Sequence, residues 1–306
     1  MERYIKLLKE AYYNIKSVGD PLGFEGKQYI FEVGSVENPE YYLFTGREYY
    51  IAGIMHVLFK HYSSVALGVR SFLKRLGLEP IKLFTRNKVV LRFKDIPAKL
   101  VRLLRKLGCR VDYIPDYDLY SGTLLLEHGF VEELEQHVNK ILSKFQKYNI
   151  KNVIVVSPHA LEILKIFSQK ALLKYPLHVV HYTEVLVNLG IESRSSKVRV
   201  AFHDPCHLAR SMGIMREPRI LIERCGATLI EPRYSQKLTN CCGAPLEYIS
   251  PHLSREIARR RLDELKSLNI DVVVTACPFC LSALLSVATE DDPGIVDLIE
   301  FLYERM

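Results

Sequence analysis

Five of the seven cysteines are regularly spaced in the carboxy-terminal half of the chain: Cys206, Cys241, Cys242, Cys277 and Cys280. The intervals before and after the adjacent pair are both 35 positions. Soft thiolates select iron–sulfur clusters, zinc or copper(I). A structural zinc ion takes four ligands, so a fifth thiol and an adjacent pair favour an iron–sulfur cluster, with zinc as the alternative. The two other cysteines, Cys109 and Cys225, are predicted as small core residues.

The sequence around these cysteines indicates how the thiols could converge. Cys277-Pro278-Phe279-Cys280 fits a tight turn between a strand and a helix, where helix N-terminal amides favour thiolates. Adjacent residues of a regular strand point to opposite faces, so Cys241 and Cys242 need an irregular loop or address different metal atoms. Cys206 follows an expected strand. We expect all three segments at the carboxyl ends of parallel strands, where α/β proteins build their sites.

Composition and charge describe a globular protein of 306 residues, with 48% hydrophobic residues and a formal net charge of +7. Positive charge of this size could favour nucleic acid, an anionic membrane surface or an acidic partner. The densest basic cluster, Arg259-Arg260-Arg261, lies in a helical pattern and predicts a solvated helix face without nucleic-acid contact. No apolar run reaches the ~20 residues of a transmembrane helix, and no signal-peptide core is present. We expect a cytoplasmic protein, peripheral to a membrane only through partner subunits.

Short apolar segments alternate with helical patterns from residue 87 onward, which favours parallel strands with right-handed crossovers. Strands are expected at 89–93, 111–114, 153–156, 178–181, 198–202, 228–230 and 271–275. Helices are expected at 98–107, 130–148, 160–173, 182–189, 216–225, 254–268 and 281–287. The segment before residue 87 is mixed, with a helix near 2–17, a strand near 28–33 and a longer helix near 51–76. The glycine-rich dinucleotide fingerprint is absent, so this fold class implies no NAD.

The sequence also matches itself in four places that occur in the same order. Residues 87–95 match 196–204, 107–108 match 225–226, 120–122 match 241–243, and 149–160 match 269–280. Opposite the five cysteines, the first copy has Pro97, Tyr120, Ser121, Ser157 and Ala160. We therefore predict an α/β fold with two duplicated Rossmann-like parallel-sheet halves. Residues 1–86 form an N-terminal extension, and 196–306 a cluster-binding half. Residues 87–195 form a half without cluster cysteines, called the cysteine-free half below although it contains Cys109.

Three stretches resemble the cysteine-rich CCG domain found in heterodisulfide reductase and its relatives. They are His203-Asp204-Pro205-Cys206-His207-Leu208-Ala209-Arg210, Cys241-Cys242-Gly243-Ala244-Pro245 and Thr275-Ala276-Cys277-Pro278-Phe279-Cys280. The close resemblance covers residues 196–290, and the cysteine-free copy extends it loosely over 87–195. It implies a non-cubane 4Fe–4S cluster built from two fused smaller units, with five ligands: Cys206, Cys241, Cys242, Cys277 and Cys280.

The same resemblance implies an iron–sulfur oxidoreductase subunit, similar to the CCG-domain subunit of heterodisulfide reductase, that transfers electrons to or from a small thiol, disulfide or sulfur substrate. Its expected partners are a ferredoxin-like subunit with cubane 4Fe–4S clusters and a flavoprotein subunit. Relatives usually have two such motifs, and the single motif here argues against independent disulfide reduction. A second hypothesis is the iron–sulfur subunit of a flavin dehydrogenase, which passes electrons from glycolate, lactate, glycerol-3-phosphate or succinate towards quinone. A third is a non-catalytic scaffold that binds zinc.

Polar residues near the cysteines could also take part in the chemistry. His203 and His207 flank Cys206 and could protonate a leaving thiolate, although hydrogen bonding is the simpler role. Arg210 could offset the negative charge of a cluster or form a surface ion pair. His159, in the cysteine-free copy, is predicted to be structural.

Overall fold

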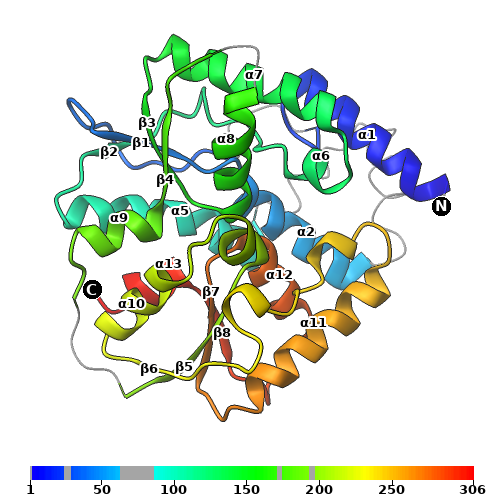
Figure 1. The fold of residues 1–306 in the computed structure, drawn as a ribbon. Coiled ribbons are helices and arrows are strands. Elements are labelled where there is room, and N and C mark those ends of the chain that lie inside the picture. Colours follow the sequence, from blue (N-terminus) through cyan, green and yellow to red (C-terminus); the bar gives the residue numbers. More distant parts are fainter. Residues whose placement is uncertain (1, 24–28, 63–85, 171–173, 193–196) are drawn as a thin grey trace.

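The computed structural model describes residues 2–23, 29–62, 86–170, 174–192 and 197–306. These residues form two four-stranded sheets in which all strand pairs are parallel, surrounded by helices (Figure 1). The first sheet has the order β2-β1-β3-β4, with β1 Tyr41–Phe44, β2 Val111–Asp112, β3 Asn152–Val155 and β4 His178–His181. The second has the order β6-β5-β7-β8, with β5 Arg199–His203, β6 Thr228–Leu229, β7 Val272–Thr275 and β8 Gly294–Asp297. The predicted α/β class with two parallel-sheet halves is confirmed.

Helices connect the strands of both sheets. In the first half they are α1 Glu2–Val18, α2 Glu48–Tyr62, α5 Lys88–Lys106, α6 Thr123–Glu127, α7 Val131–Lys147, α8 Pro158–Lys170 and α9 Tyr182–Asn188. The second half has α10 Arg216–Arg224, α11 Pro251–Lys266, α12 Pro278–Val287 and α13 Leu298–Tyr303. Shorter turns of helix are a π-helical turn η2 at His207–Ser211 and two 3₁₀ turns, η3 Gln236–Leu238 and η4 Ala244–Leu246.

Elements of the two halves follow one another in the same order, as the internal repeat predicts. Strands β3 and β7 occupy the same position in their sheets, and their first residues, Asn152 and Val272, are 120 positions apart. Before these strands, Asn149 and Asn269 both adopt left-handed backbone, with φ of 51° and 52°. Asparagine tolerates this conformation better than most residues do. The predicted match of residues 149–160 with 269–280 is confirmed.

The predicted match of residues 87–95 with 196–204 is wrong. Residues 89–93 belong to helix α5, whose start is capped by Asn87 Oδ1 accepting a hydrogen bond from the Val89 amide at 2.8 Å. Buried Val90, Phe93 and Pro97 follow helical spacing, which places one face against the core. The strand equivalent to β5 is instead β1, from the segment predicted as an extension. The sheet register consequently aligns Arg47, and not Pro97, with Cys206.

Other predicted elements differ more modestly from the structure. No strand occurs at residues 29–33, the described part of the strand expected at 28–33. The long helix expected near 51–76 is described only as α2, and its remainder lies outside the described residues. Strand β8 and helix α13 have no counterpart among the predicted elements, although they repeat the geometry of β4 and α9. Within the described residues, no helix is long and apolar enough to cross a membrane.

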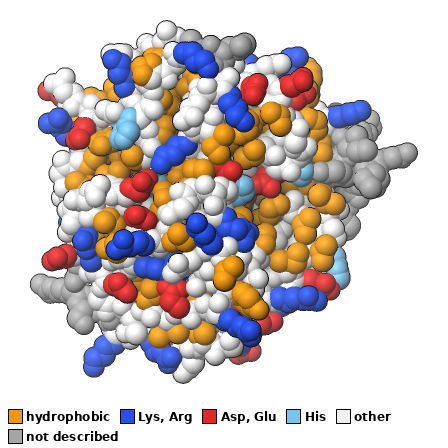
Figure 2. Space-filling view, viewed as in Figure 1, with side chains coloured by type: hydrophobic (Ala, Val, Ile, Leu, Met, Phe, Trp, Pro, Cys, Tyr) orange, Lys and Arg blue, Asp and Glu red, His pale blue; other side chains and the backbone are white. Residues whose placement is uncertain are grey.

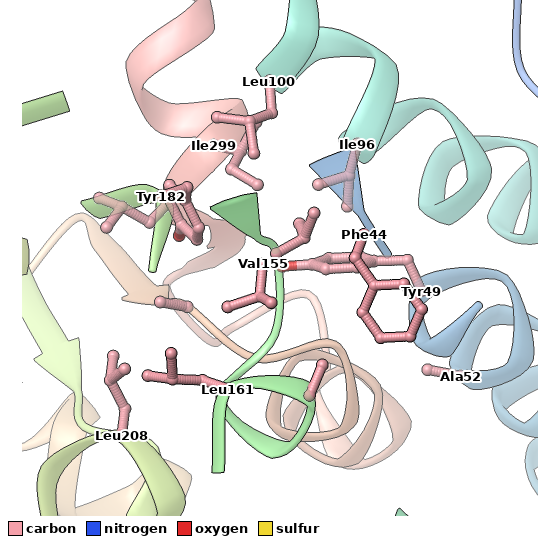
Figure 3. Packing of buried hydrophobic residues seen from close by; sticks show 14 of the residues in the cluster. Phe44, Tyr49, Ala52, Ile96, Leu100, Val155, Leu161, Tyr182, Leu208 and Ile299 are labelled. Atoms are coloured by element: carbon pink, nitrogen blue, oxygen red, sulfur yellow. The ribbon is translucent and has the colours of Figure 1, made fainter. Parts of the chain in front are cut away.

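The two halves share one hydrophobic core. Figure 3 shows Val155 and Leu161 of the first half in the same cluster as Leu208 and Ile299 of the second. Helix α2 packs against α12, and α8 packs against η2. Because α2 and η2 both follow the matched strands β1 and β5, the same kind of packing is made twice. On the face shown in Figure 2, Lys and Arg are interspersed with Asp and Glu.

Buried polar contacts also cross between the halves. Tyr49 is 1% exposed and donates its hydroxyl to Asp297 Oδ2 at 2.8 Å. Asp297 also caps α13 by accepting a hydrogen bond from the Ile299 amide at 2.8 Å. Nearby, the Arg92 guanidinium donates to Glu300 Oε1 and Oε2 at 2.8 and 2.7 Å. These bonds connect α2 and α5 of the first half to the end of β8 and the start of α13.

Replacing Tyr49→Phe should lower the free energy of unfolding by about 1–3 kcal/mol, because it leaves a buried carboxylate oxygen without its donor. Denaturant titration of the wild type and the variant measures this loss. The matched control is Tyr303→Phe, since Tyr303 is 37% exposed and its substitution should change stability little. Equal effects of the two substitutions would show that the bond between the halves contributes nothing.

Candidate metal centre

The five cysteines predicted as ligands lie at one end of the second sheet. Cys206 comes after β5, and Cys277 is the N-cap of α12 immediately after β7. Cys280 is in the first turn of that helix. Cys241 and Cys242 lie in the loop between η3 and η4. The structure thus brings all three segments to the carboxyl ends of parallel strands, as the sequence predicts.

An irregular loop holds the adjacent pair of cysteines. Gly243 follows the pair with φ of 86°, and its amide donates to Cys241 Sγ at 3.3 Å. A Cβ atom at this position would lie 2.5 Å from the backbone oxygen of Ser254, so only glycine fits. The Ser254 hydroxyl donates to the Gly243 carbonyl at 2.9 Å, which fixes the loop to helix α11. This backbone allows both neighbouring thiols to face the same group of cysteines.

The five thiols form one continuous series of contacts, in the order Cys206, Cys241, Cys242, Cys280 and Cys277. The contact with Cys206, followed by that with Cys242, lowers the pKa of Cys241 to about 2. The contact with Cys241 raises the pKa of Cys206, and burial adds to this effect. One thiolate is therefore stabilised by its protonated neighbours. Because neighbouring thiolates repel one another, all five can ionise together only around a cation. This donor set fits an iron–sulfur or zinc centre.

A pocket opens from the cysteines to solvent, and its empty space, part of which is open solvent, amounts to about 690 Å³. Four of the five cysteines line it, together with residues of both halves. The first half contributes Ile51, Met55, Tyr120, Leu124, Glu127, His128 and His159. The second half contributes Pro205, Cys206, His207, Cys242, Ala244, Pro245, Glu247, Tyr248, Cys277, Phe279 and Cys280. The wall is mostly apolar, with a few ionisable side chains.

His207 is the centre of the ionisable group on the pocket wall. Its Nε2 lies 2.7 Å from Glu127 Oε1, and its Nδ1 contacts Glu162. Burial lowers the pKa of His207, but the contacts with Glu127 and Glu162 outweigh burial and raise the pKa to about 10. His159 lies beside it, with ring centroids 4.1 Å apart, and burial holds the pKa of His159 well below its usual range. Neither glutamate could be identified from the sequence, because their proximity arises only when α6 and α8 pack beside η2.

His203 has a different environment, because it is buried behind the cysteines. Burial lowers its pKa to about 3, with the nearby Arg261 as a second cause. The prediction that residues 259–261 form a solvated helix face is wrong for Arg261, which is 1% exposed. Arg210 is exposed and donates Nη1 to the Thr239 carbonyl at 2.8 Å, beside the loop of the adjacent cysteines. Cys109 and Cys225 are buried apart from the site, as predicted.

The first half has a hydrogen-bonded carboxyl group at the equivalent place. Ser121 and Ser157, which match Cys242 and Cys277 in the repeat, both donate their hydroxyls to Glu48. Thr123 donates to the same side chain. Glu48 is completely buried, and burial raises its pKa to about 7 against the hydrogen bonds, which lower it. A carboxyl group with three hydroxyl partners therefore fills the position where the second half has thiols.

Glu48→Gln should make stability less dependent on pH. The pKa of Glu48 is about 7 in the folded protein and 4.5 ordinarily, so the folded state retains a proton that the unfolded chain releases. The stability contribution of Glu48 consequently falls as pH rises from about 4.5 to 7. We expect the variant to gain up to about 3 kcal/mol relative to wild type across this window. Denaturant titrations at several pH values measure this difference, and the exposed substitution Glu132→Gln controls for net charge. A constant difference between variant and wild type would contradict the buried, protonated Glu48.

Comparison with known proteins agrees with the position of the cysteines. Residues 200–285 match the family of the cysteine-rich CCG domain. The chain is 28% identical to the EtfAB:quinone oxidoreductase of Syntrophomonas wolfei, over 70% of this chain and 32% of that protein. It is 27% identical to a subunit of the fumarate reductase (CoM/CoB) of Methanothermobacter marburgensis, over 76% of this chain and 48% of that subunit. It is 26% identical to a subunit of the dihydromethanophenazine:CoB–CoM heterodisulfide reductase of Methanosarcina barkeri, over 67% and 54% respectively.

The coverage and identity of these matches also limit what can be inferred from them. The chain spans about a third to a half of the length of these curated relatives. Among solved structures, a hypothetical protein from Helicobacter pylori has a similar fold, with a TM-score of 0.52 and 14% identity over 69% of this chain and 46% of the other. The likeness at that identity concerns the fold alone. Residues 200–285 match the CCG cysteine-rich domain, and 67–76% of the chain aligns with reductase subunits and with a probable iron–sulfur-binding oxidoreductase of Bacillus subtilis.

Proposed function

We propose that the chain is an iron–sulfur oxidoreductase subunit with one cluster, held by Cys206, Cys241, Cys242, Cys277 and Cys280. The observation that carries this proposal is the continuous series of contacts among five thiols at the base of an open pocket. The CCG domain and the names of several relatives support the same cofactor class. Zinc is the weaker alternative, because a tetrahedral ion would leave one buried thiol without a ligand role.

The cluster we propose is a non-cubane 4Fe–4S cluster. A single cubane cluster uses four cysteines, so five converging thiols suit a larger or extended metal centre better. The adjacent Cys241 and Cys242 support this type, because neighbouring ligands can address different iron atoms. When bound, such a cluster supplies a site that accepts and gives up electrons. The protein contributes the Gly243 amide, which donates to Cys241 Sγ, and a mostly apolar wall that restricts water.

A small uncharged thiol, disulfide or sulfur compound is the substrate we propose for the pocket. The described residues that line it include aromatic and aliphatic side chains but no Lys or Arg, and His207 is already paired with Glu127 and Glu162, so an anionic substrate would find no unpaired cation among them. Reduction of one disulfide to two thiols takes two electrons and two protons. Electrons would come from the ferredoxin-like partner, and protons from solvent through the open pocket. His207 lines the pocket and is better placed than the buried His203 to contact such a substrate.

The partners we propose are a ferredoxin-like subunit with cubane clusters and a flavoprotein subunit. The relatives compared above are up to about three times longer than the segment they share with this chain. Two of these relatives are named as subunits of reductases, which supports partner subunits for this chain. Such subunits could also hold the chain at a membrane surface.

A second candidate function is electron relay from a flavin dehydrogenase towards quinone. The relative named EtfAB:quinone oxidoreductase supports this alternative. A relay needs a cluster near a docking surface and no substrate in the pocket. Binding of small thiols to the pocket therefore distinguishes the two functions.

Cys241→Ala and Cys242→Ala should each remove most of the bound iron, because each variant lacks one of the proposed ligands. Anaerobically purified wild type should contain about four irons and four sulfides per chain. Cys109→Ala is the matched control, since Cys109 is buried apart from the site and should keep its iron. Iron and sulfide analysis measures all four proteins. Stoichiometric zinc without iron, or normal iron in both site variants, would contradict the proposal.

Titration of the wild type with a small uncharged thiol should change the absorption and electron paramagnetic resonance spectra of the cluster. Ala244→Phe should weaken this response at least tenfold while retaining iron, because the larger side chain narrows the pocket. Ala288→Phe serves as the control outside the pocket lining. Spectra that do not respond to thiol in the wild type would instead support the electron-relay function.

A further inference from the structure

A buried arginine contacts the histidine that ends strand β5. Arg261 and His203 are each 1% exposed. Arg261 Nε donates a hydrogen bond to His203 Nδ1 at 3.1 Å. The guanidinium is held by Glu264, whose Oε2 accepts from Arg261 Nη1 at 2.7 Å. Residues 203 and 261 are thus connected in one fixed arrangement between β5 and α11.

This contact determines which nitrogen of His203 carries its proton. Arginine has five N–H donors and no acceptor, so the nitrogen that faces Arg261 must offer a lone pair. Nδ1 is therefore unprotonated, and the neutral imidazole has its hydrogen on Nε2. A doubly protonated ring would place two donors against each other. The arginine consequently selects one tautomer of His203.

The remaining nitrogen of His203 is available to the cysteines. Nε2 is buried and has no hydrogen-bond partner among the described residues. A ring nitrogen of His203 and the sulfur atoms of Cys242 and Cys280 lie within 4.8 Å of one another. Since Nδ1 is occupied by Arg261, Nε2 is the nitrogen available to these sulfurs. A buried N–H without an acceptor is costly, which a sulfur acceptor would relieve.

We infer that His203 donates a hydrogen bond from Nε2 to sulfur of the bound cluster and is not a metal ligand. This inference rests on the proposed function. A ligand role would require a lone pair on Nε2 and hence a proton on Nδ1, directly opposite the Arg261 donor. Arg261 is then a positioning residue, because it acts on the cluster through the tautomer of His203. The acceptor would be the thiolate of Cys242 or Cys280, or a sulfide of the cluster.

The cysteine-free half supports this assignment by comparison. Sheet register aligns His203 with Phe44, since these residues pair with Thr275 and Val155 respectively. Arg261 matches Ile141, which lies 120 positions earlier on the equivalent helix α7 and is fully buried. Both positions are therefore apolar in the half without thiols. His203 and Arg261 thus occur in the half that has the five cysteines, as expected if this pair provides a hydrogen bond to the cluster.

The consequence is a higher reduction potential. Hydrogen bonds to cluster sulfurs stabilise the more negative, reduced state, and they are one of the ways in which proteins set such potentials. His203→Leu should shift the midpoint potential of the cluster to more negative values. His203→Gln, which offers an amide N–H, should restore part of the shift. Arg261→Met should also lower the potential, because the imidazole is no longer held in one tautomer.

Redox titration followed by electron paramagnetic resonance measures these potentials in the purified protein. Arg260→Met is the matched control, because Arg260 is the exposed neighbour of Arg261 on the same helix. Unchanged potentials in both His203→Leu and Arg261→Met would overturn the inference. In wild-type protein labelled with ¹⁵N-histidine, pulsed spectra should show weak nitrogen coupling to the iron spins. Strong coupling, of the size given by an iron-bound imidazole, would show that His203 is a ligand.

A second measurement does not depend on iron. In the metal-free protein, ¹⁵N chemical shifts should assign the neutral Nε2–H tautomer to His203, and Arg261→Met should mix the two tautomers. The Nδ1–H tautomer in the wild type would overturn the inference even if iron were present. If the protein instead binds zinc and no iron, the proposed function fails. The tautomer measurement would still show which nitrogen of His203 carries the proton.

Discussion

The site depends on one electrostatic constraint, which is the convergence of five thiols where burial and mutual repulsion both oppose ionisation. Neighbouring thiolates destabilise one another unless a cation lies among them. The protein contributes compensating donors: the Gly243 amide on one side and the pair of His203 and Arg261 on the other. Much of the local backbone follows from this requirement, including the glycine at 243, where the oxygen of Ser254 excludes any side chain.

In the first half, polar side chains also converge at the buried strand ends, but they are hydroxyl and carboxyl groups in place of thiols. Ser121 and Ser157 stand where the second half has two cysteines, and both donate to the buried Glu48. A protonated carboxyl group and hydroxyls satisfy one another through hydrogen bonds, so no charge has to be buried. The strand order is the same in both halves, and β3 and β7 are each followed by a helix. A few side chains at the strand ends therefore determine whether this fold builds a thiol cluster or a neutral hydrogen-bonded core.

The cysteine segments could be placed from the sequence because their signals are local: a tight Cys277–Cys280 turn, a glycine beside an adjacent pair, and a strand before Cys206. Residues 89–93 resemble a strand in the sequence because Val89 and Val90 favour extended backbone, whereas helix α5 is stabilised by tertiary burial of the face that includes Val90 and Phe93. The sequence does not indicate the burial of Arg261 either, because its partner His203 is 58 positions away in the chain. Residues of both halves line the pocket. The hydrophobic periodicity of one segment does not predict which distant segments pack against it.

Those contacts give the cysteine-free half a physical role. Helix α2 of the first half packs on α12, the helix that begins at Cys277, and helix α8 packs on η2, which begins just after Cys206. The two helical segments that follow proposed ligands are thus each covered by an element of the other half. Tyr49 and Arg92 add hydrogen bonds to Asp297 and Glu300 across the same boundary. Without this cover, water would reach the thiols from a second side, and the pocket would lose the wall that includes Tyr120, Leu124 and Glu127. The first half, which lacks the cluster cysteines, therefore forms the second wall of the site that the other half builds.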